Sequence, residues 1–307
     1  MEAYITDKWG GKSALPLLLE WEFIHSLDSC DGFTVKMPLV SGLAPKLERA
    51  LVFDAYHDGK TVFRGLVDEY ELIADEKGAF ALLTGRGYGA LLLDNEAESA
   101  EYWSPAMQQI LDNHIYPFGI GRVKYKNMEC SGRFPVSSGQ SQWKVLRDFC
   151  YFAAGIEPWF DREGQLILDG SAGEKIRFQQ GAISAQCCRE KHYGVFSQVL
   201  VKNTAAGVST LVENPNALGL CRRVVTMPRY TQYDSMRHTG EYQIHQSEKG
   251  SKTMLITLPI AFAAFAGDRV ELVDSPLGIS GNFTVRESRC VATGKAAYTR
   301  LELVREE

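Results

Sequence analysis

Short β-prone runs separated by tight turns are the feature that most constrains the fold of this 307-residue chain. In the clearest case, Asp58-Gly59 stands between residues 51–57 and residues 60–65, and both runs carry aromatic and β-branched side chains. A type I′ turn needs positive φ at both central residues, which an Asp-Gly pair tolerates, so the sequence predicts a β-hairpin here. A second return is predicted at residues 76–78. Four or five short strands joined by such turns favour a small barrel or sandwich.

Between residues 90 and 170 the hydrophobic period changes from that of strands to that of helices. One helix is predicted to begin with Ser104 as its N-cap and Pro105 at its first helical position. Apolar residues then recur every three or four positions along one face, namely Met107, Ile110, Leu111, His114 and Ile115. A second helix is predicted from an N-capping Ser141 to a terminating Gly155.

The last third of the chain returns to strand-like patterns. Residues 269–272, 283–286 and 300–303 alternate apolar with polar side chains, which is typical of strands with one buried face. A further strand is predicted over residues 195–201. Residues 231–251 are polar and have no clear period, so no structure is assigned to them.

These patterns predict a β-rich α+β protein of three modules. Two small β-barrel-like modules, at residues 1–89 and 181–307, flank an α+β module at residues 90–180. Residues 62–83 and 283–301 resemble each other as aromatic-led hairpins of similar spacing, which would fit an internal repeat of the β-module.

Composition excludes several classes of function. Hydrophobic residues make up 45% and charged residues 23% of the chain, as in ordinary folded proteins. The net charge is −5 and no Lys/Arg cluster is present, so specific nucleic-acid binding is not expected. The N-terminus has no basic segment followed by an apolar core, so no signal peptide is expected. The most apolar stretch, residues 254–266, is shorter than the roughly 20 residues of a membrane-spanning helix, so no membrane association is expected.

The seven cysteines predict reduced thiols rather than disulfides or a metal site. Their number is odd, their spacing is scattered and no CxxC pair occurs, which favours a cytoplasmic environment. Cys187-Cys188 with His192 could suggest a metal site, but adjacent cysteines rarely bind one tetrahedral zinc ion and no second pair follows. Buried thiols that pack as small apolar groups are favoured instead. We therefore expect no metal and no cofactor.

Two further patterns invite a catalytic interpretation. Residues 85–89 read Gly-Arg-Gly-Tyr-Gly, whereas a dinucleotide site needs GxGxxG at the start of a helix in a βαβ unit. A chain corner that uses the conformational freedom of glycine is favoured. The acidic residues Asp94, Glu96, Glu98 and Glu101 could supply the carboxylate pair of a glycosidase, but such a pair needs an apolar pocket that raises one pKa. A solvated loop is favoured, and the sequence predicts no catalytic residues.

Six runs of the sequence together resemble the baseplate hub proteins of Mu-like and PBSX-like prophages, which belong to the late-control protein D superfamily and include proteins of tail-like bacteriocins. The most specific run is Thr-Gly-Arg-Gly-Tyr-Gly-Ala-Leu-Leu-Leu-Asp-Asn-Glu-Ala at residues 84–97. The matching runs, in the order of the family, are residues 15–23, 30–35, 62–71, 84–97, 267–270 and 277–285.

The resemblance implies a structural protein without catalytic residues. In such hubs, two similar β-barrel modules per chain alternate around the threefold axis of a homotrimer. The ring then matches the sixfold tail tube on one side and the threefold central spike on the other. The implied partners are further copies of the chain, the tube protein, the spike protein and other baseplate proteins. The implied location is the bacterial host cytoplasm during assembly, and afterwards the baseplate of a virion or tail-like particle.

Two alternatives stay open at this point. A tail-associated cell-wall hydrolase would need a carboxylate pair or a zinc triad in a cleft, and the candidate carboxylates are Glu96 and Glu101. A receptor- or carbohydrate-binding β-module would need exposed aromatic side chains, for which the candidates are Tyr102, Trp103, Tyr230 and Tyr233.

Overall fold

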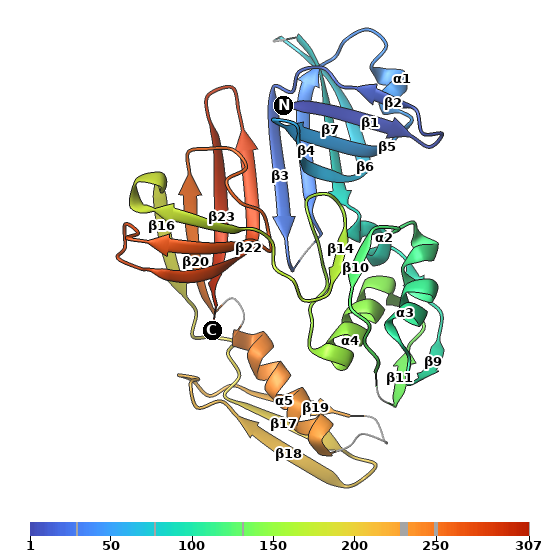
Figure 1. Cartoon of the computed structure of the whole chain (residues 1–307), viewed down its shortest axis with the longest axis vertical. Coiled ribbons are helices and arrows are strands. Elements are labelled where there is room, and N and C mark those ends of the chain that lie inside the picture. The colour runs from blue at the N-terminus through green and yellow to red at the C-terminus, as the bar shows by residue number, and fades with distance from the viewer. Residues whose placement is uncertain (29, 77, 131, 228–232, 249–250, 307) are drawn as a thin grey trace.

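The computed structural model describes residues 1–306 except 29, 77, 131, 228–232 and 249–250. For residues 233–235 it describes the backbone only. Strands predominate and the helices are few, so the predicted β-rich α+β class is confirmed. Figure 1 shows the N-terminal strands, the helical middle, the C-terminal strands and a small separate body that contains α5.

The N-terminal β-module forms as the turn signals predict. Asp58 and Gly59 have φ of 50° and 72°, and they connect β5 to β6 in an antiparallel hairpin. The pairing order is β3-β4-β7-β6-β5-β1-β2. The elements are β1 (Glu2–Asp7), β2 (Lys12–Ala14), β3 (Glu20–Ser26), β4 (Gly32–Pro38), α1 (Ala44–Leu47), β5 (Ala50–His57), β6 (Lys60–Asp75) and β7 (Gly78–Gly87).

Aromatic side chains fill the core of this module. Phe23, Phe33, Phe53 and Phe63 are almost fully buried, and the rings of Phe33 and Phe53 stack with their centroids 4.1 Å apart. Each fully buried Phe contributes about 1.5–3 kcal/mol relative to an exposed one. The alternation of buried and half-exposed residues along β4 places these rings on one face of the sheet.

The middle module carries the helices. Its elements are α2 (Gly89–Leu93), β8 (Glu96–Ala97), β9 (Ala100–Trp103), α3 (Met107–His114), η1 (Tyr116–Phe118), β10 (Val123–Tyr125), β11 (Arg133–Val136), β12 (Gln140–Ser141), α4 (Gln142–Ala154), β13 (Trp159–Phe160) and β14 (Leu166–Leu168). The second predicted helix is confirmed as α4. The Ser141 hydroxyl accepts a hydrogen bond from the Lys144 N–H at 3.2 Å, and Gly155 ends the helix with φ of 65°.

The start of the first predicted helix was wrong, although its buried face was right. All five predicted apolar positions are buried, but α3 begins at Met107, with Ala106 in the capping position. Ser104 has φ of 47°, and its hydroxyl accepts a hydrogen bond from the Gly132 N–H at 3.1 Å. This contact holds Ser104, between β9 and α3, against the loop that leads to β11, so Ser104 does not cap α3.

The C-terminal strands form a second β-module, and β15, which precedes residue 181, pairs with its strand β21. Its elements are β15 (Lys175–Gln179), η2 (Gln180–Ala182), β16 (Ala185–Glu190), β20 (Lys252–Leu258), β21 (Arg269–Val273), β22 (Gly281–Ala292) and β23 (Ala297–Arg305). Its core includes Ile256, Leu272, Val285 and Leu301. The division at residues 89 and 180 stays a prediction.

A small insert lies between β16 and β20. It consists of a three-stranded sheet in the order β18-β17-β19 and of α5, which packs on one face of that sheet. The elements are β17 (Gln198–Asn203), β18 (Val208–Glu213), β19 (Arg222–Thr226) and α5 (Tyr233–Glu248). The predicted strand at residues 195–201 is thus found three residues later. Most of residues 231–251, to which no structure was assigned, forms α5.

The two β-modules repeat one another in chain order and in pairing. β3, β4, β7 and β6 take successive places in the N-terminal module, and β16, β20, β23 and β22 take the same places in the C-terminal one. The fourth strand is long in both cases and carries a bulge, after Val67 in β6 and after Val285 in β22. Before the bulge it pairs with β5 or with β21.

The two modules are joined through their strands. Beyond its bulge, β22 pairs with β3, from Glu287 opposite Ser26 to Ala292 opposite Trp21. This pairing merges both modules into one 13-stranded sheet. None of the helices in the described parts of the chain is long and apolar enough to cross a membrane.

Candidate functional site

The glycines of the Gly85–Gly89 run serve close strand packing. A Cβ atom on Gly85 would lie 2.0 Å from the Leu66 carbonyl oxygen and 2.5 Å from the ring of Phe33. A Cβ atom on Gly87 would lie 2.9 Å from the Cβ of Asp31. Both glycines are therefore needed where β7 passes close to β6 and to the β3–β4 turn. The prediction of a corner that uses the conformational freedom of glycine was wrong, because Gly85 and Gly87 lie within β7 and neither they nor Gly89 has a positive φ. β7 leads into the five-residue α2 rather than into a phosphate-binding loop of the GxGxxG kind.

Arg86, within the same run, joins two carboxylates. Its guanidinium donates to Asp68 at 2.7 and 3.1 Å and to Asp94 at 2.7 and 3.0 Å. These hydrogen bonds hold the pKa of Asp94 below its ordinary value and raise that of Arg86. Asp94 is thus an ionised partner in a bidentate pair and cannot act as a general acid at neutral pH.

The remaining carboxylates of the acidic run do not form a catalytic pair in a cleft. Glu96, Glu98 and Glu101 are exposed, as Asp94 is. Arg133 donates to Glu101 at 2.6 Å from the neighbouring strand β11. A glycosidase acid needs an apolar surrounding that raises its pKa, and these side chains lie in water.

His114 is a buried residue with a complete set of partners. Gln142 Nε2 donates to the Glu96 carbonyl at 3.0 Å, which leaves Gln142 Oε1 to accept from His114 Nδ1 at 2.7 Å. The Tyr102 hydroxyl accepts from Asn113 and donates to His114 Nε2 at 2.9 Å. The ring is therefore neutral, and burial lowers its pKa.

We expect acid to destabilise the middle module through His114. The folded-state pKa lies below the ordinary 6.5, so this stabilisation is complete above pH 6.5 and is lost as the pH falls further. Between pH 7 and 5 the free energy of urea unfolding should fall by at most about 1.4 kcal/mol per pH unit for this one proton. The slope should shrink in His114→Gln and persist in His238→Gln, whose imidazole is exposed. Equal slopes in both variants would contradict the assignment.

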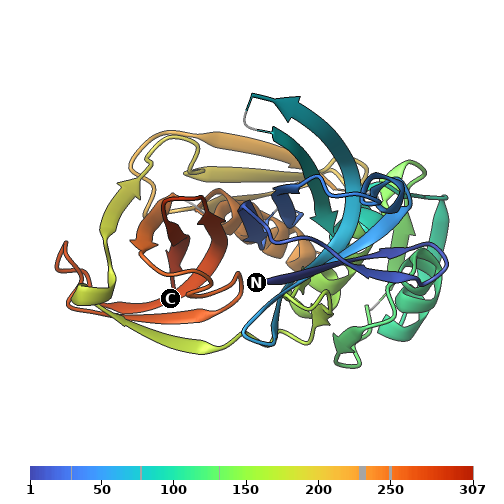
Figure 2. The ribbon, with the colours of Figure 1, turned by 90° about the horizontal axis from the view of Figure 1, so that it is seen from above.

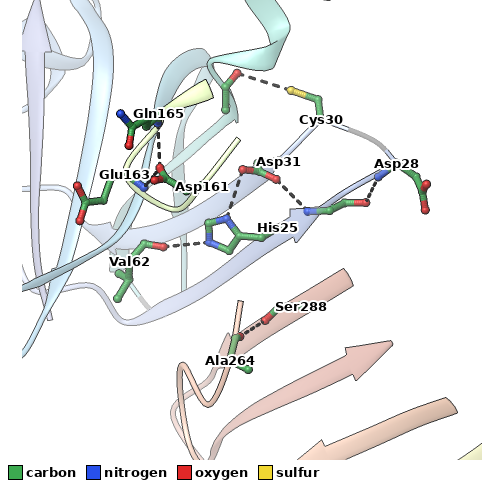
Figure 3. Close-up of polar contacts among 12 residues, drawn as sticks. His25, Asp28, Cys30, Asp31, Val62, Asp161, Glu163, Gln165, Ala264 and Ser288 are labelled. Carbon is green, nitrogen blue, oxygen red and sulfur yellow. Dashed lines mark hydrogen bonds and ion pairs between the residues drawn. The ribbon is translucent and has the colours of Figure 1, made fainter. Parts of the chain in front are cut away.

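A small cavity of about 60 Å³ lies where the N-terminal and middle modules meet, lined in part by Cys30, Asp31 and Trp143. Figure 3 shows the polar contacts beside it. His25 contacts the Asp31 carboxylate at 3.3 Å and the Val62 carbonyl at 2.9 Å, and Asp31 also accepts from the Ser26 N–H. Burial raises the pKa of the Cys30 thiol to about 12, so this cysteine is protonated and unreactive. The contacts fix the β3–β4 turn, and the cavity is too small for a substrate.

The suspected metal residues are not brought together. Cys187 and Cys188 are exposed on β16, where neighbouring residues point to opposite faces. This corrects the expectation that they are buried. His192 follows in the chain that leads to the insert. The described residues contain no group of three or more His, Cys, Asp or Glu side chains placed to hold a metal ion.

The aromatic candidates are divided between packing and exposure. Tyr102 is held by His114, as described, whereas Trp103 is 74% exposed. Tyr230 lies outside the described residues, and Tyr233 begins α5 with a side chain that is not described. Of the four candidates, Trp103 is therefore the one whose side chain is described and exposed, and alone it forms no aromatic stripe.

Two open strand edges are the most distinctive surface of the molecule. β5 pairs with β6 only as far as Leu66, so residues 68–75 pair with β7 alone. β16 pairs with β20 alone. Nearly all residues of both segments are exposed on both faces of the strand. Figure 2 shows the β6–β7 hairpin projecting from the ribbon at the top and β16 at the left.

Comparison with solved structures identifies the architecture. Neither a protein-family model nor a curated protein matches the sequence. A tail protein from Neisseria meningitidis MC58 aligns over 99% of this chain and 96% of its own, with a TM-score of 0.79 and 15% identity. The 43 kDa tail protein of prophage MuSo2 from Shewanella oneidensis aligns over 99% and 98%, with a TM-score of 0.79 and 16% identity. The chain has the phage tail-protein fold.

The same fold extends to secretion machinery. A component of the type VI secretion system of E. coli, described as structurally similar to the T4 tail proteins gp27 and gp5, aligns over 94% of this chain and 74% of its own. Its TM-score is 0.57 and its identity 10%. The resemblance predicted from the sequence is thus confirmed at the level of the fold. The open edges of β6 and β16 belong to the repeated β-modules, and no local pattern in the sequence predicts them.

Proposed function

We propose that the chain is the baseplate hub of a phage tail or tail-like particle and acts as a structural protein without enzymatic activity. The observation that carries the proposal is the repeat of the β-module, with the same strand order and the same bulge at both ends of one chain. Three such chains present six similar modules. A threefold ring can therefore face a sixfold tail tube, while the middle module and the insert occur only three times.

The solved structures of the same fold support this role. They include two tail proteins, one of them from a prophage, and a component of a secretion system described as similar to tail proteins. The proposed partners are the tube protein, the central spike, other baseplate proteins and two further copies of the chain. The proposed modules are residues 1–89, 90–180 and 181–307, and the proposed sequence of locations is the host cytoplasm and then the baseplate.

The first test is the mass of the particle in solution. Light scattering after size-exclusion chromatography, at micromolar concentration, should give three times the chain mass of 34.2 kDa. Obligate ring interfaces bury roughly 2,000–5,000 Å² and persist at such concentrations. A monomer at every concentration would contradict the proposal. Release of peptidoglycan fragments by the purified chain, lost on Glu96→Gln or Glu101→Gln, would favour the hydrolase instead.

A further inference from the structure

Unpaired strand edges expose backbone donors and acceptors that other strands can bind. Residues 69–74 of β6 and residues 185–190 of β16 are two such edges, and they lie well apart in the ribbon of Figure 2. A ring with head-to-tail contacts needs two different surfaces that fit each other. These two edges meet that requirement, because one belongs to each β-module.

The chain itself shows how such an edge is filled. In the C-terminal module, the part of β22 beyond its bulge pairs with β3, the first strand of the four-strand row in the N-terminal module. The corresponding part of β6 has no such neighbour in the described chain. In the C-terminal module, the strand that takes the position of β3 is β16. The β22–β3 junction inside one chain is therefore a template for a β6–β16 junction between two chains.

Two rows of paired residues align the modules position by position. Each row starts at the residue before the bulge and follows directly paired residues from strand to strand. In the N-terminal module the row is Val67, Gly85, Phe33 and Phe23. In the C-terminal module it is Val285, Leu303, Met254 and Cys188. Cys188 thus takes the position of Phe23. Within the chain, Phe23 lies opposite Cys290, five residues beyond Val285. The residue five beyond Val67 is Leu72.

We infer that β6 beyond its bulge pairs antiparallel with β16 of the next copy, with Leu72 opposite Cys188. This inference rests on the proposed trimeric hub and assigns the contact that closes it. Each copy would then contribute the eight strands from β16 to β6 to one closed barrel.

The charges on the two edges support this register. It places Glu71 opposite Arg189 and Glu69 opposite Lys191 of the next copy. None of these four side chains forms an ion pair within the described part of its own chain, and Glu69, Glu71 and Arg189 are exposed. Opposite charges directly across two strands stabilise the pair, and like charges destabilise it.

The apolar positions agree with the charges. Leu72 is 46% exposed and Cys188 is exposed, whereas their counterparts Cys290 and Phe23 are buried at the junction inside the chain. The proposed pairing would cover both. The far edge of the 13-stranded sheet, β2, is a poorer partner because it has only three residues, whereas β16 has six.

Cysteine crosslinking tests the register directly. Residues opposite each other in antiparallel strands have Cβ atoms about 4.5–5.5 Å apart, close to the geometry of a disulfide. Leu72→Cys should therefore form covalent oligomers up to the trimer on a non-reducing gel, through native Cys188. Ile73→Cys should do so through Cys187, on the other face of the strands. Wild-type protein, with cysteines on one edge only, should form none.

Matched double variants read the register and separate the two proposals. Cys188→Ser should abolish the crosslink of Leu72→Cys but keep that of Ile73→Cys, and Cys187→Ser should do the reverse. A slip of one residue would leave only one of the two engineered cysteines opposite a native one, either Leu72→Cys opposite Cys187 or Ile73→Cys opposite Cys188, and would overturn the register. A trimer by light scattering without any crosslink would overturn the edge pairing and leave the hub proposal intact. A chain that stays monomeric would overturn both.

Charge exchange gives an independent readout. Glu71→Arg should weaken assembly by about fivefold per interface, since like charges then face each other. Arg189→Glu should do the same, and the double variant should recover assembly. The thermal unfolding of the separated monomer should stay unchanged in all three, because both positions are exposed. Weakening by either single variant without recovery in the double variant would reject this pair.

Discussion

Replacing Gly85 by alanine is expected to lower the free energy of unfolding by about 3 kcal/mol or more, at the upper end for overpacking. The added Cβ would lie 2.0 Å from the Leu66 carbonyl oxygen, which belongs to the backbone of β6. A backbone atom cannot move away by a rotamer change, so β6 and β7 must separate. On the β4 side, the ring of Phe33 would lie 2.5 Å from the same Cβ, so β7 cannot shift in that direction either.

Urea unfolding, followed by circular dichroism, measures this effect. The matched control is Gly121→Ala, because a Cβ there meets nothing within 4 Å and the backbone does not need positive φ. Gly121→Ala should change the stability by less than about 1 kcal/mol, because at such a loop position alanine mainly lowers the conformational entropy of the unfolded chain. Equal effects of both substitutions would show that β6 and β7 do not approach as closely as described.

The second large effect is expected for Phe23→Ala. This side chain is fully buried, and its ring lies 5.5 Å from that of Phe63 and 5.9 Å from that of Phe262, centroid to centroid. Phe262 belongs to the segment between β20 and β21, so Phe23 packs a segment of the C-terminal module into the core of the N-terminal one. Truncation of a buried Phe costs about 3–5 kcal/mol, through lost burial and the cavity that remains.

The control for this cavity is Phe152→Ala, the same chemical change at an exposed position of α4. It should shift the midpoint of urea unfolding little. For Phe23→Ala we also expect faster proteolysis of the residues 259–268, which lose a neighbour. Unchanged stability of Phe23→Ala would argue against a shared core between the two modules.

Local structure was predictable where one residue type has one physical role. The Asp58-Gly59 turn and the Ser141 and Gly155 ends of α4 are of this kind, because turn and cap geometries depend on few neighbours. The start of α3 failed for the opposite reason. Ser104 has a cap-forming side chain, but a distant partner, the Gly132 N–H, competes for it.

The helix α5 was not predicted because its sequence is polar and has no clear helical period. Gly240 interrupts the helical pattern and lowers its intrinsic stability. The structure explains this residue, since a Cβ at that position would lie 2.4 Å from a methyl group of Val212 in β18. The glycine lets the helix pack closely on the sheet. A sequence pattern records the local cost of such a residue but not the contact that requires it.

Function was the less predictable part, and the reason is again distance along the chain. The β22–β3 junction joins residues more than 250 positions apart, such as Arg289 and Glu22, whose side chains form an ion pair at 3.1 Å. No local pattern encodes such a pairing. The repeated hairpins indicated two related modules, but the open edges became visible only when the strands were placed beside each other.

The position of the insert determines where this architecture can vary in length. β16 and β20 are paired at its base, where Glu190 and Lys252 form an ion pair at 3.1 Å, so chain added at this tip leaves the strands in place. The equivalent connection in the N-terminal module is the β3–β4 turn, whose Asp31 is buried against His25 and the Ser26 N–H. Of these two matching connections, the one between β16 and β20 can therefore take up additional residues, whereas the β3–β4 turn cannot.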